Sequence, residues 1–265
     1  MCGDPAAHSF VAGAFVWHDR SALLERTGAT DQENQNLDVL VASPAKPFSY
    51  GFGHRYMIFD FSAIEPQTNA HLHTSFVPLH WQRDGLRLSA ALALSASSNV
   101  MGHPQEYARE TLQLLFALVT AREIDERLTF DYGICGDHRF GEYRVYPVAG
   151  LDWRPHPDWQ LELGFPETRI SYTIVEQLTS TLQLAPDGNE WRVENRDFSA
   201  ASDFVYEALA LQWITAWEPG PRLSLAVSLG RQLRNRYEMT LANGERISVS
   251  GEPADRLGFE VRWRF

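Results

Sequence analysis

The last nine residues of the chain, 257–265 (LGFEVRWRF), alternate strictly between apolar side chains and glycine or charged side chains. In an extended strand, alternate residues point to opposite faces, so one face of this segment is apolar and the other is polar. A strand needs this pattern when lipid lies on one side and packed polar groups or water lie on the other. The segment therefore predicts a membrane-crossing β-strand that ends on an aromatic residue.

The same alternation recurs upstream, most strongly in segments 86–95, 128–135, 159–165 and 223–229. Most of these stretches approach the roughly 9–11 residues that a tilted strand needs to cross a bilayer. No window reaches the roughly 18–20 apolar residues of a membrane-spanning helix. The chain is therefore expected to cross the membrane with strands.

We predict an all-β fold, a closed antiparallel up-and-down transmembrane barrel of about twelve strands, with fourteen or ten as alternatives. Two weaker segments, Phe10–His18 and Asn36–Ala42, raise the count to fourteen if they are included. Residues 1–51 are expected to form a partly irregular N-terminal segment, and residues 52–265 the barrel. The twelve candidate strands begin near Arg55, Ala70, Leu86, Arg109, Arg127, Glu142, Asp158, Thr168, Thr179, Asp203, Arg222 and Arg256.

The predicted connections are short at one end of the barrel and mostly longer at the other, as in bacterial transmembrane barrels. The short ones are Gln82–Gly85, Ala121–Asp125, Arg154–Asp158, Val175–Gln177 and Glu218–Pro221. Five of the eight tryptophans fall at this short-turn end, where an indole ring can lie at the membrane interface. This predicted aromatic girdle consists of Trp81, Trp153, Trp159, Trp217 and Trp263.

The charge balance limits the partners. The chain has 23 basic and 34 acidic residues, a formal net charge of −11, so a polyanion such as nucleic acid is repelled overall. No phosphate-binding glycine pattern occurs, and no cofactor is expected.

Charged residues on the polar faces of the strands are expected to point into the barrel. Opposite charges in a narrow lumen pair and fill the interior, which predicts a structural network of ion pairs. A second interpretation is a narrow channel whose arginines favour small anionic solutes. The predicted lumen charges are Arg87, Asp131, Arg144, Asp152, Glu162, Arg169, Arg234, Arg236, Glu260, Arg262 and Arg264.

Two groups of residues are candidates for chemistry. Asp137 and His138 lie in a predicted extracellular connection, where a histidine base could activate water or a serine. No serine motif accompanies them, and the protein is not expected to be an enzyme. His71 and His73 share a strand face but have no evident third ligand, so no metal site is predicted.

The C-terminal strand resembles the signal by which the assembly machinery of the bacterial outer membrane recognises its barrel clients, carried here by Phe259, Val261, Trp263 and Phe265. The stretch YRVYPVAGLDWRPHPDWQLELGFPETRISYT, with DGNEWRVEN and the final LGFEVRWRF, resembles an uncharacterised family of proteobacterial outer-membrane barrels. The resemblance covers roughly the C-terminal half. It implies an outer-membrane location with the C-terminus in the periplasm, and lipid and the assembly machinery as partners. It supplies no catalytic residues and no oligomeric state.

Two other functions remain alternatives to a structural barrel or narrow channel. One is an outer-membrane enzyme that acts on lipid or peptide at the outer rim. The other is a soluble β-sandwich or a lipocalin-like binding protein, because aromatic residues also lie near strand ends in such folds.

Overall fold

The computed structural model describes residues 10–22, 31–45, 47–61, 69–102, 110–195, 200–240 and 244–264. These residues form β-strands with one short helix, and no helix among them is long and apolar enough to cross a membrane. The elements are β1 Phe10–Ala22, β2 Asp31–Ala45, β3 Phe48–Phe61, β4 Asn69–Arg83, β5 Leu86–Ser97, α1 Ser98–Met101, β6 Leu112–Asp125, β7 Leu128–Asp137, β8 Arg144–His156, β9 Trp159–Phe165, β10 Thr168–Val175, β11 Leu178–Asn195, β12 Ala200–Trp217, β13 Leu223–Thr240, β14 Arg246–Gly251 and β15 Ala254–Arg264.

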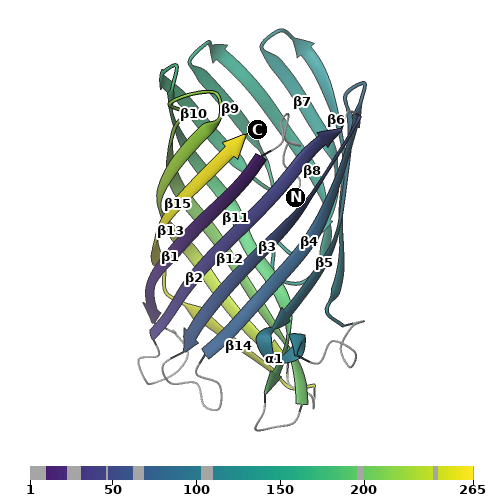
Figure 1. The fold of residues 1–265 in the computed structure, drawn as a ribbon, viewed down its shortest axis with the longest axis vertical. Helices are drawn as coiled ribbons and strands as arrows, with labels where there is room; N and C mark the ends of the chain where they lie inside the picture. The colour runs from purple at the N-terminus through teal and green to yellow at the C-terminus, as the bar shows by residue number, and fades with distance from the viewer. Residues whose placement is uncertain are drawn as a thin grey trace.

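The strands form one sheet that closes on itself. From β1 to β13 each strand pairs antiparallel with the next, and the first strand pairs with the last, β15. In Figure 1 the purple β1 accordingly lies beside the yellow β15. The closed antiparallel all-β barrel predicted from the sequence is confirmed, and a soluble two-sheet sandwich is excluded.

The strand count of twelve is too low. Both β14 and β15 pair with β13, one along its second part and the other along its first, so the fifteen described strands occupy fourteen positions around the barrel. The structure places β1 and β2 within residues 1–51, where they complete the wall between β15 and β3. No strand was predicted between those that begin near Arg222 and Arg256, but the structure has β14 there, which is only six residues long.

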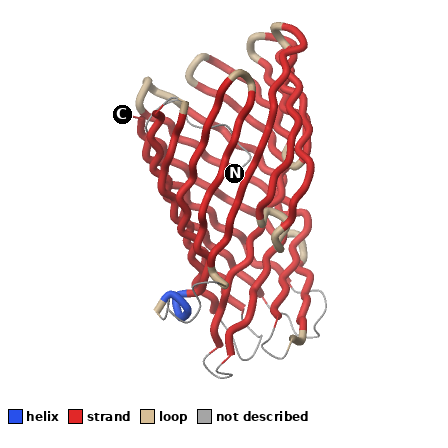
Figure 2. The backbone as a smooth tube through the Cα atoms, turned by 90° about the vertical axis from the view of Figure 1, so that its right-hand side faces the viewer, coloured by secondary structure: helices blue, strands red, loops and turns tan. Residues whose placement is uncertain are grey.

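The two ends of the barrel differ in their connections. We call one the tight-turn end, because turns such as Asp84-Gly85, Glu126-Arg127 and Glu176-Gln177 join its strands. Asp84 and Gly85 both have positive φ, the conformation of a two-residue hairpin turn that matches the twist of the strands. The chain also ends at this end (Figure 1). The opposite end, which we call the loop end, carries α1, as Figure 2 shows.

The outer surface carries a belt of exposed apolar side chains, and alternate residues on the same strands face inward. On β4, for example, Val77 and Leu79 are about half exposed, whereas Thr74 is buried. Of the predicted girdle, Trp153, Trp159, Trp217 and Trp263 are 41–47% exposed and Trp81 is partly buried. All five lie near the tight-turn end. An apolar outside with a polar inside is the reverse of a soluble barrel and suits a hydrocarbon environment.

The wall is uneven in height. The strands β9 and β10 have seven and eight residues, whereas β11, β12 and β13 have eighteen each. Pairing of β10 with β11 therefore stops at Thr168 and Leu184. Farther toward the loop end, β11 pairs instead with β5, in parallel, at Arg192 and Ala96. The barrel thus narrows at the loop end, where β6 to β10 do not reach.

Inside this narrow part, apolar side chains fill the interior. Phe59 of β3 is fully buried and has ring contacts with residues of three other strands, with centroid distances between 5.3 and 6.3 Å. We call the five aromatic residues of this cluster the aromatic plug. They are Phe59, Trp191, Phe204, Tyr206 and Tyr237. Since their rings come from both sides of the barrel, the plug closes the interior toward the loop end.

Candidate functional site in the barrel interior

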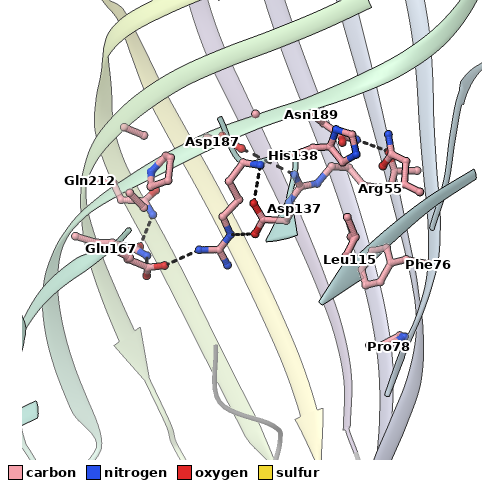
Figure 3. Close-up of a pocket in the computed structure, with 18 of the residues that line it drawn as sticks. Arg55, Phe76, Pro78, Leu115, Asp137, His138, Glu167, Asp187, Asn189 and Gln212 are labelled. Carbon is pink, nitrogen blue, oxygen red and sulfur yellow. Dashed lines mark hydrogen bonds and ion pairs between the residues drawn. The ribbon is translucent and has the colours of Figure 1, made fainter. Parts of the chain in front are cut away.

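A cavity of about 500 Å³ lies inside the barrel next to the aromatic plug. A polar layer separates the two: Thr74 Oγ1 accepts hydrogen bonds from Asn189 Nδ2 at 2.9 Å and from Trp191 Nε1 at 3.0 Å. Figure 3 shows side chains from several strands converging on this space. The cavity volume falls within the roughly 300–1,000 Å³ range of small-molecule sites.

Four arginines and three carboxylates line the cavity. Asp187 of β11 lies between two of the arginines, with Arg256 Nη1 at 3.2 Å and Arg55 Nη1 at 3.9 Å. Arg139 lies between Asp137, at 3.5 Å, and Glu167, at 3.3 Å. The guanidinium groups that line this cavity therefore outnumber its carboxylates by one.

Glu167 is the centre of a second network and lies in the turn between β9 and β10. Arg169, Arg139 and the Gln183 amide all donate to its carboxylate, and the Gln212 amide donates to Gln183. Burial alone would raise the pKa of Glu167, but the charges of Arg169 and Arg139 outweigh burial and hold it below the ordinary value. Glu167 is therefore a fixed negative charge that orients two of the arginines.

Asp137 and His138 are placed differently from the sequence-based expectation. Asp137 is 3% exposed, and its carboxylate accepts hydrogen bonds from Tyr146 Oη at 2.9 Å and from the Arg139 backbone N–H at 3.0 Å. His138 is 7% exposed, and its Nδ1 lies 3.3 Å from Glu190 Oε2. The two residues help to enclose the cavity and do not form an open extracellular rim.

Short strands and close packing explain this placement. Because β7 stops before it reaches the loop end of the barrel, the turn that follows it folds against β11. A Cβ atom at Gly188 of β11 would lie 2.8 Å from both the Arg139 carbonyl oxygen and the Gly141 nitrogen. Only glycine at position 188 permits this approach, so the turn that contains His138 fills the gap where β10 no longer covers β11.

The predicted lumen charges closer to the tight-turn end form ion pairs. Arg87 contacts Asp131 at 2.7 Å, and a second cavity of about 190 Å³ is lined by both of them, by Asp152 and by residues of the first cavity. Three further ion pairs contain predicted lumen charges: Arg169 with Glu162 at 3.7 Å, Arg262 with Glu260 at 2.9 Å, and Arg264 with Glu218 at 2.8 Å.

Arg234 and Arg236 lie on the outer face, contrary to the prediction. The register of β12 with β13 shifts between Leu209 and Ala210, so that one extra residue of β13 reverses its alternation. Asn235 and Tyr237 are buried as a result, and Arg236 bonds Glu238 and Ser248.

Arg144 begins β8 opposite Asp137, in the same alternate series as the buried Tyr146, and is exposed.

Sequence reasoning missed five charged cavity residues, which are Arg55, Arg139, Glu167, Asp187 and Arg256. Arg256 continues the alternate series of Glu260 and Arg262, so the periodicity could have found it. Arg139 and Glu167 lie in turns, where no periodicity exists. Asp187 has no such signal either, because the sequence predicted where its strand begins, near Thr179, but not where it ends.

His71 and His73 lie on β4 in the outward-facing series of Val77 and Leu79, outside the interior site. Among the residues that the structure describes, no group of three or more histidine, cysteine, aspartate or glutamate side chains is arranged to hold a metal ion.

Comparisons with known proteins define the fold. No protein-family model matches the chain, and no curated protein matches it. Among solved structures, the COG4313 outer membrane channel from Pseudomonas putida F1 is similar over 100% of this chain and 98% of its own, at 9% identity and a TM-score of 0.51. A bacterial polysaccharide outer membrane secretin covers 99% of this chain and 100% of its own at 11% identity and a TM-score of 0.48, and the KdgM porin in complex with oligogalacturonate covers 96% and 99% at 9% identity and 0.43. The chain thus has the closed-barrel fold of outer-membrane channels.

Proposed function

We propose that this protein is an outer-membrane channel that binds small anionic polar solutes in its interior and is closed toward the loop end by the aromatic plug. The observation that carries the proposal is the cavity of about 500 Å³ in which four arginines meet three carboxylates. It lies inside a barrel whose outside is apolar. Packed side chains would stabilise a purely structural barrel better than a polar cavity of this size does.

The outer surface supports the location. The belt of exposed leucine, valine and aromatic side chains would be costly in water but matches lipid. In barrels of bacterial outer membranes the short turns face the periplasm. We therefore orient the tight-turn end and the C-terminus toward the periplasm and the loop end outward.

The charge pattern supports the anion preference. Guanidinium groups bind carboxylate and phosphate through paired N–H donors. An entering anion would bind the guanidinium groups of Arg55 or Arg139 beside their ion pairs with Asp187 and Glu167. The amide groups of Gln113, Gln183 and Gln212 add neutral hydrogen-bonding capacity in the same cavity.

Ion selectivity in planar bilayers tests the proposal. Under a potassium chloride gradient we expect small currents with a reversal potential that indicates anion preference. Arg55→Gln should reduce the preference, since it removes a cavity charge. Arg236→Gln is the matched control, because Arg236 lies on the outer face, and it should leave the reversal potential unchanged. Cation preference, or an equal effect of both substitutions, would contradict the proposal.

A purely structural barrel is the second candidate, and the closed plug favours it. It predicts no current from the native protein and none when the plug is weakened. The two candidates therefore differ in the behaviour of plug variants in the same bilayers.

A further inference from the structure

The outer face near the loop end carries a chain of hydrogen-bonding side chains that the proposed channel does not use. Ser98 Oγ lies 2.8 Å from His73 Nε2. The other ring nitrogen, His73 Nδ1, lies 3.5 Å from His54 Nε2. His54 Nδ1 in turn lies 2.9 Å from Ser75 Oγ. We call these four residues, Ser98, His73, His54 and Ser75, the outer-face relay.

From these contacts we propose that Ser98 is the nucleophile of an acyl-ester hydrolase site on the outer face, with His73 as its general base. A serine hydroxyl becomes nucleophilic when a histidine within about 2.6–3.2 Å accepts its proton and a third group orients that histidine. The outer-face relay supplies the first contact directly, and His54 occupies the orienting position.

The hydrogen bonds of the relay are consistent with this direction of proton transfer. Two directions of donation satisfy the three contacts. In one of them Ser98 donates to His73 Nε2, His73 Nδ1 donates to His54 Nε2, and His54 Nδ1 donates to Ser75 Oγ. This direction leaves a lone pair of His73 facing the hydroxyl proton of Ser98, as a general base requires.

Ring packing fixes His73 in place. The Tyr56 ring stacks on it, with centroids 4.9 Å apart, and the His54 ring lies 5.5 Å away. The hydroxyl of Tyr56 is itself bonded to His71 Nδ1. Ser98, in contrast, is exposed at the start of α1, so a substrate can reach its hydroxyl. A held base beside an accessible hydroxyl is the arrangement that acyl transfer uses.

The position of the relay indicates the substrate class. His73 belongs to the same outward-facing series of β4 as Val77 and Leu79, and on the neighbouring strand Leu92 is also half exposed. The relay therefore begins where the apolar belt ends. A lipid in the surrounding leaflet places its acyl chains against the belt and its ester carbonyls at this level. We infer that the substrate is the carboxylic ester of a membrane lipid, which rests on the proposed membrane location.

The reaction balances with water as the only co-substrate. Ser98 Oγ bonds to the ester carbonyl carbon while its proton passes to His73 Nε2. The carbon–oxygen bond to the alcohol then breaks, and His73 returns the proton to the leaving alkoxide, which leaves an acyl group on Ser98. Water attacks this ester after giving a proton to His73, and the proton returns to Ser98 as the fatty acid departs.

Labelling with a fluorophosphonate, and hydrolysis of p-nitrophenyl butyrate, test the site in the full-length protein folded in detergent. We expect label on Ser98 and none in Ser98→Ala. His73→Gln should lower hydrolysis by about 10²–10⁴-fold. Ser171→Ala, which removes a serine bonded to Thr181 on β11, is the control and should keep full activity. Heat-modifiable migration verifies that each variant is folded. Absence of label in folded native protein, or persistent label in Ser98→Ala, would overturn the proposal.

His54 is a positioning residue, and its two variants separate that role from simple packing. His54→Ala removes the acceptor for His73 Nδ1 and should lower the rate, whereas the amide oxygen of His54→Gln can accept the same proton and should restore part of it. Equal loss in both variants would remove His54 from the mechanism.

The substrate class and the membrane location are tested separately. Phospholipid vesicles that contain the protein should release fatty acid, and release should stop in Ser98→Ala while the bilayer currents stay unchanged. Hydrolysis of the soluble ester without release from vesicles would refute the lipid substrate but keep the relay. Loss of channel currents with intact hydrolysis would refute the proposed channel alone.

Discussion

Phe59 of β3 contacts Tyr206 of β12 inside the barrel, with ring centroids 5.3 Å apart and ring planes inclined by 62°. The two strands are far apart in the order of the sheet. A contact between them means that side chains, and not water, occupy the interior at this level. Both residues are at most 1% exposed. The loop end is therefore held together by a packed core, whereas the middle of the barrel holds a polar cavity.

Removing the ring of Phe59 should open the barrel. Phe59→Ala deletes the side chain that contacts residues of β11, β12 and β13, so we expect larger and longer currents in planar bilayers than the native protein gives. The same change should lower the free energy of unfolding by about 3–5 kcal/mol, as for other buried phenylalanines.

Phe52→Ala is the matched control. Phe52 lies on the same strand but is 52% exposed on the outer face, so its loss should leave the current unchanged. Currents that do not rise in folded Phe59→Ala would show that the plug is not the barrier and would favour a purely structural barrel.

The ion pair of Arg87 and Asp131 should stabilise the barrel, because each side chain compensates the charge of the other. The two side chains are about a quarter exposed and 2.7 Å apart. Asp131→Asn leaves the guanidinium without its carboxylate and should lower the free energy of unfolding by about 1–3 kcal/mol. Adding Arg87→Met to Asp131→Asn should recover part of the loss. Urea unfolding followed by tryptophan fluorescence measures both effects.

An exposed ion pair serves as the control for these substitutions. Arg231 and Asp255 are 58% and 68% exposed and 3.8 Å apart, so Asp255→Asn should change stability by less than about 0.5 kcal/mol. Strict additivity of the Arg87 and Asp131 substitutions would contradict the coupling.

Glu167 should make stability depend on acid pH. Because Arg169 and Arg139 hold its pKa below the ordinary value, the folded protein keeps this carboxylate charged at pH values where the unfolded chain binds a proton. Its contribution is therefore fully present at neutral pH and is lost as the pH falls through the lowered pKa.

The measurement compares melting temperatures of the native protein and Glu167→Gln from neutral to acid pH. The native protein should be the more stable at neutral pH, and the difference should shrink as the pH falls. Glu123→Gln, at an exposed position, is the control and should show a small, nearly constant difference. A difference in melting temperature that increases toward acid pH would contradict the lowered pKa of Glu167.

The wall of the barrel could be predicted because periodicity records which face of a strand meets lipid. The alternation of Leu257, Phe259 and Val261 is the signal of a strand with one lipid-facing side, and the structure places Phe259 48% exposed. β14 was not predicted because its six residues lie within a polar segment and only Val249 and Gly251 among them are buried. Short strands carry too few alternations to be distinguished from a loop.

The candidate site could be predicted only in part, because it depends on how strands end. Arg234 and Arg236 were assigned to the lumen by counting alternate residues, and one bulge in β13 reversed that count. The aromatic plug was missed for a different reason. Phe59 and Trp191 face inward where a porin-like alternation predicts polar groups, because the strands extend beyond the lipid belt and need a core there. Neither effect follows from periodicity within a single strand.

The last prediction concerns the assembly of the barrel into the membrane. Pairing of β15 with β1 extends to Arg264, and pairing of β15 with β13 extends to Trp263, so these partners already hold the last strand. Phe265 lies outside the described residues. If its role is recognition by the assembly machinery of the outer membrane, as its resemblance to the terminal signal implies, deleting it should not impair the folded barrel.

We therefore expect deletion of Phe265 to leave refolding in detergent unchanged, judged by heat-modifiable migration on a gel. In vesicles that carry the assembly machinery, the same deletion should slow the appearance of the folded band. Trp263→Ala is the contrasting variant, because it removes a side chain that is 47% exposed at the tight-turn end as well as part of the signal, and it should affect both reactions. Equal rates for native protein and the Phe265 deletion in those vesicles would assign recognition to Phe259, Val261 and Trp263 without the terminal residue.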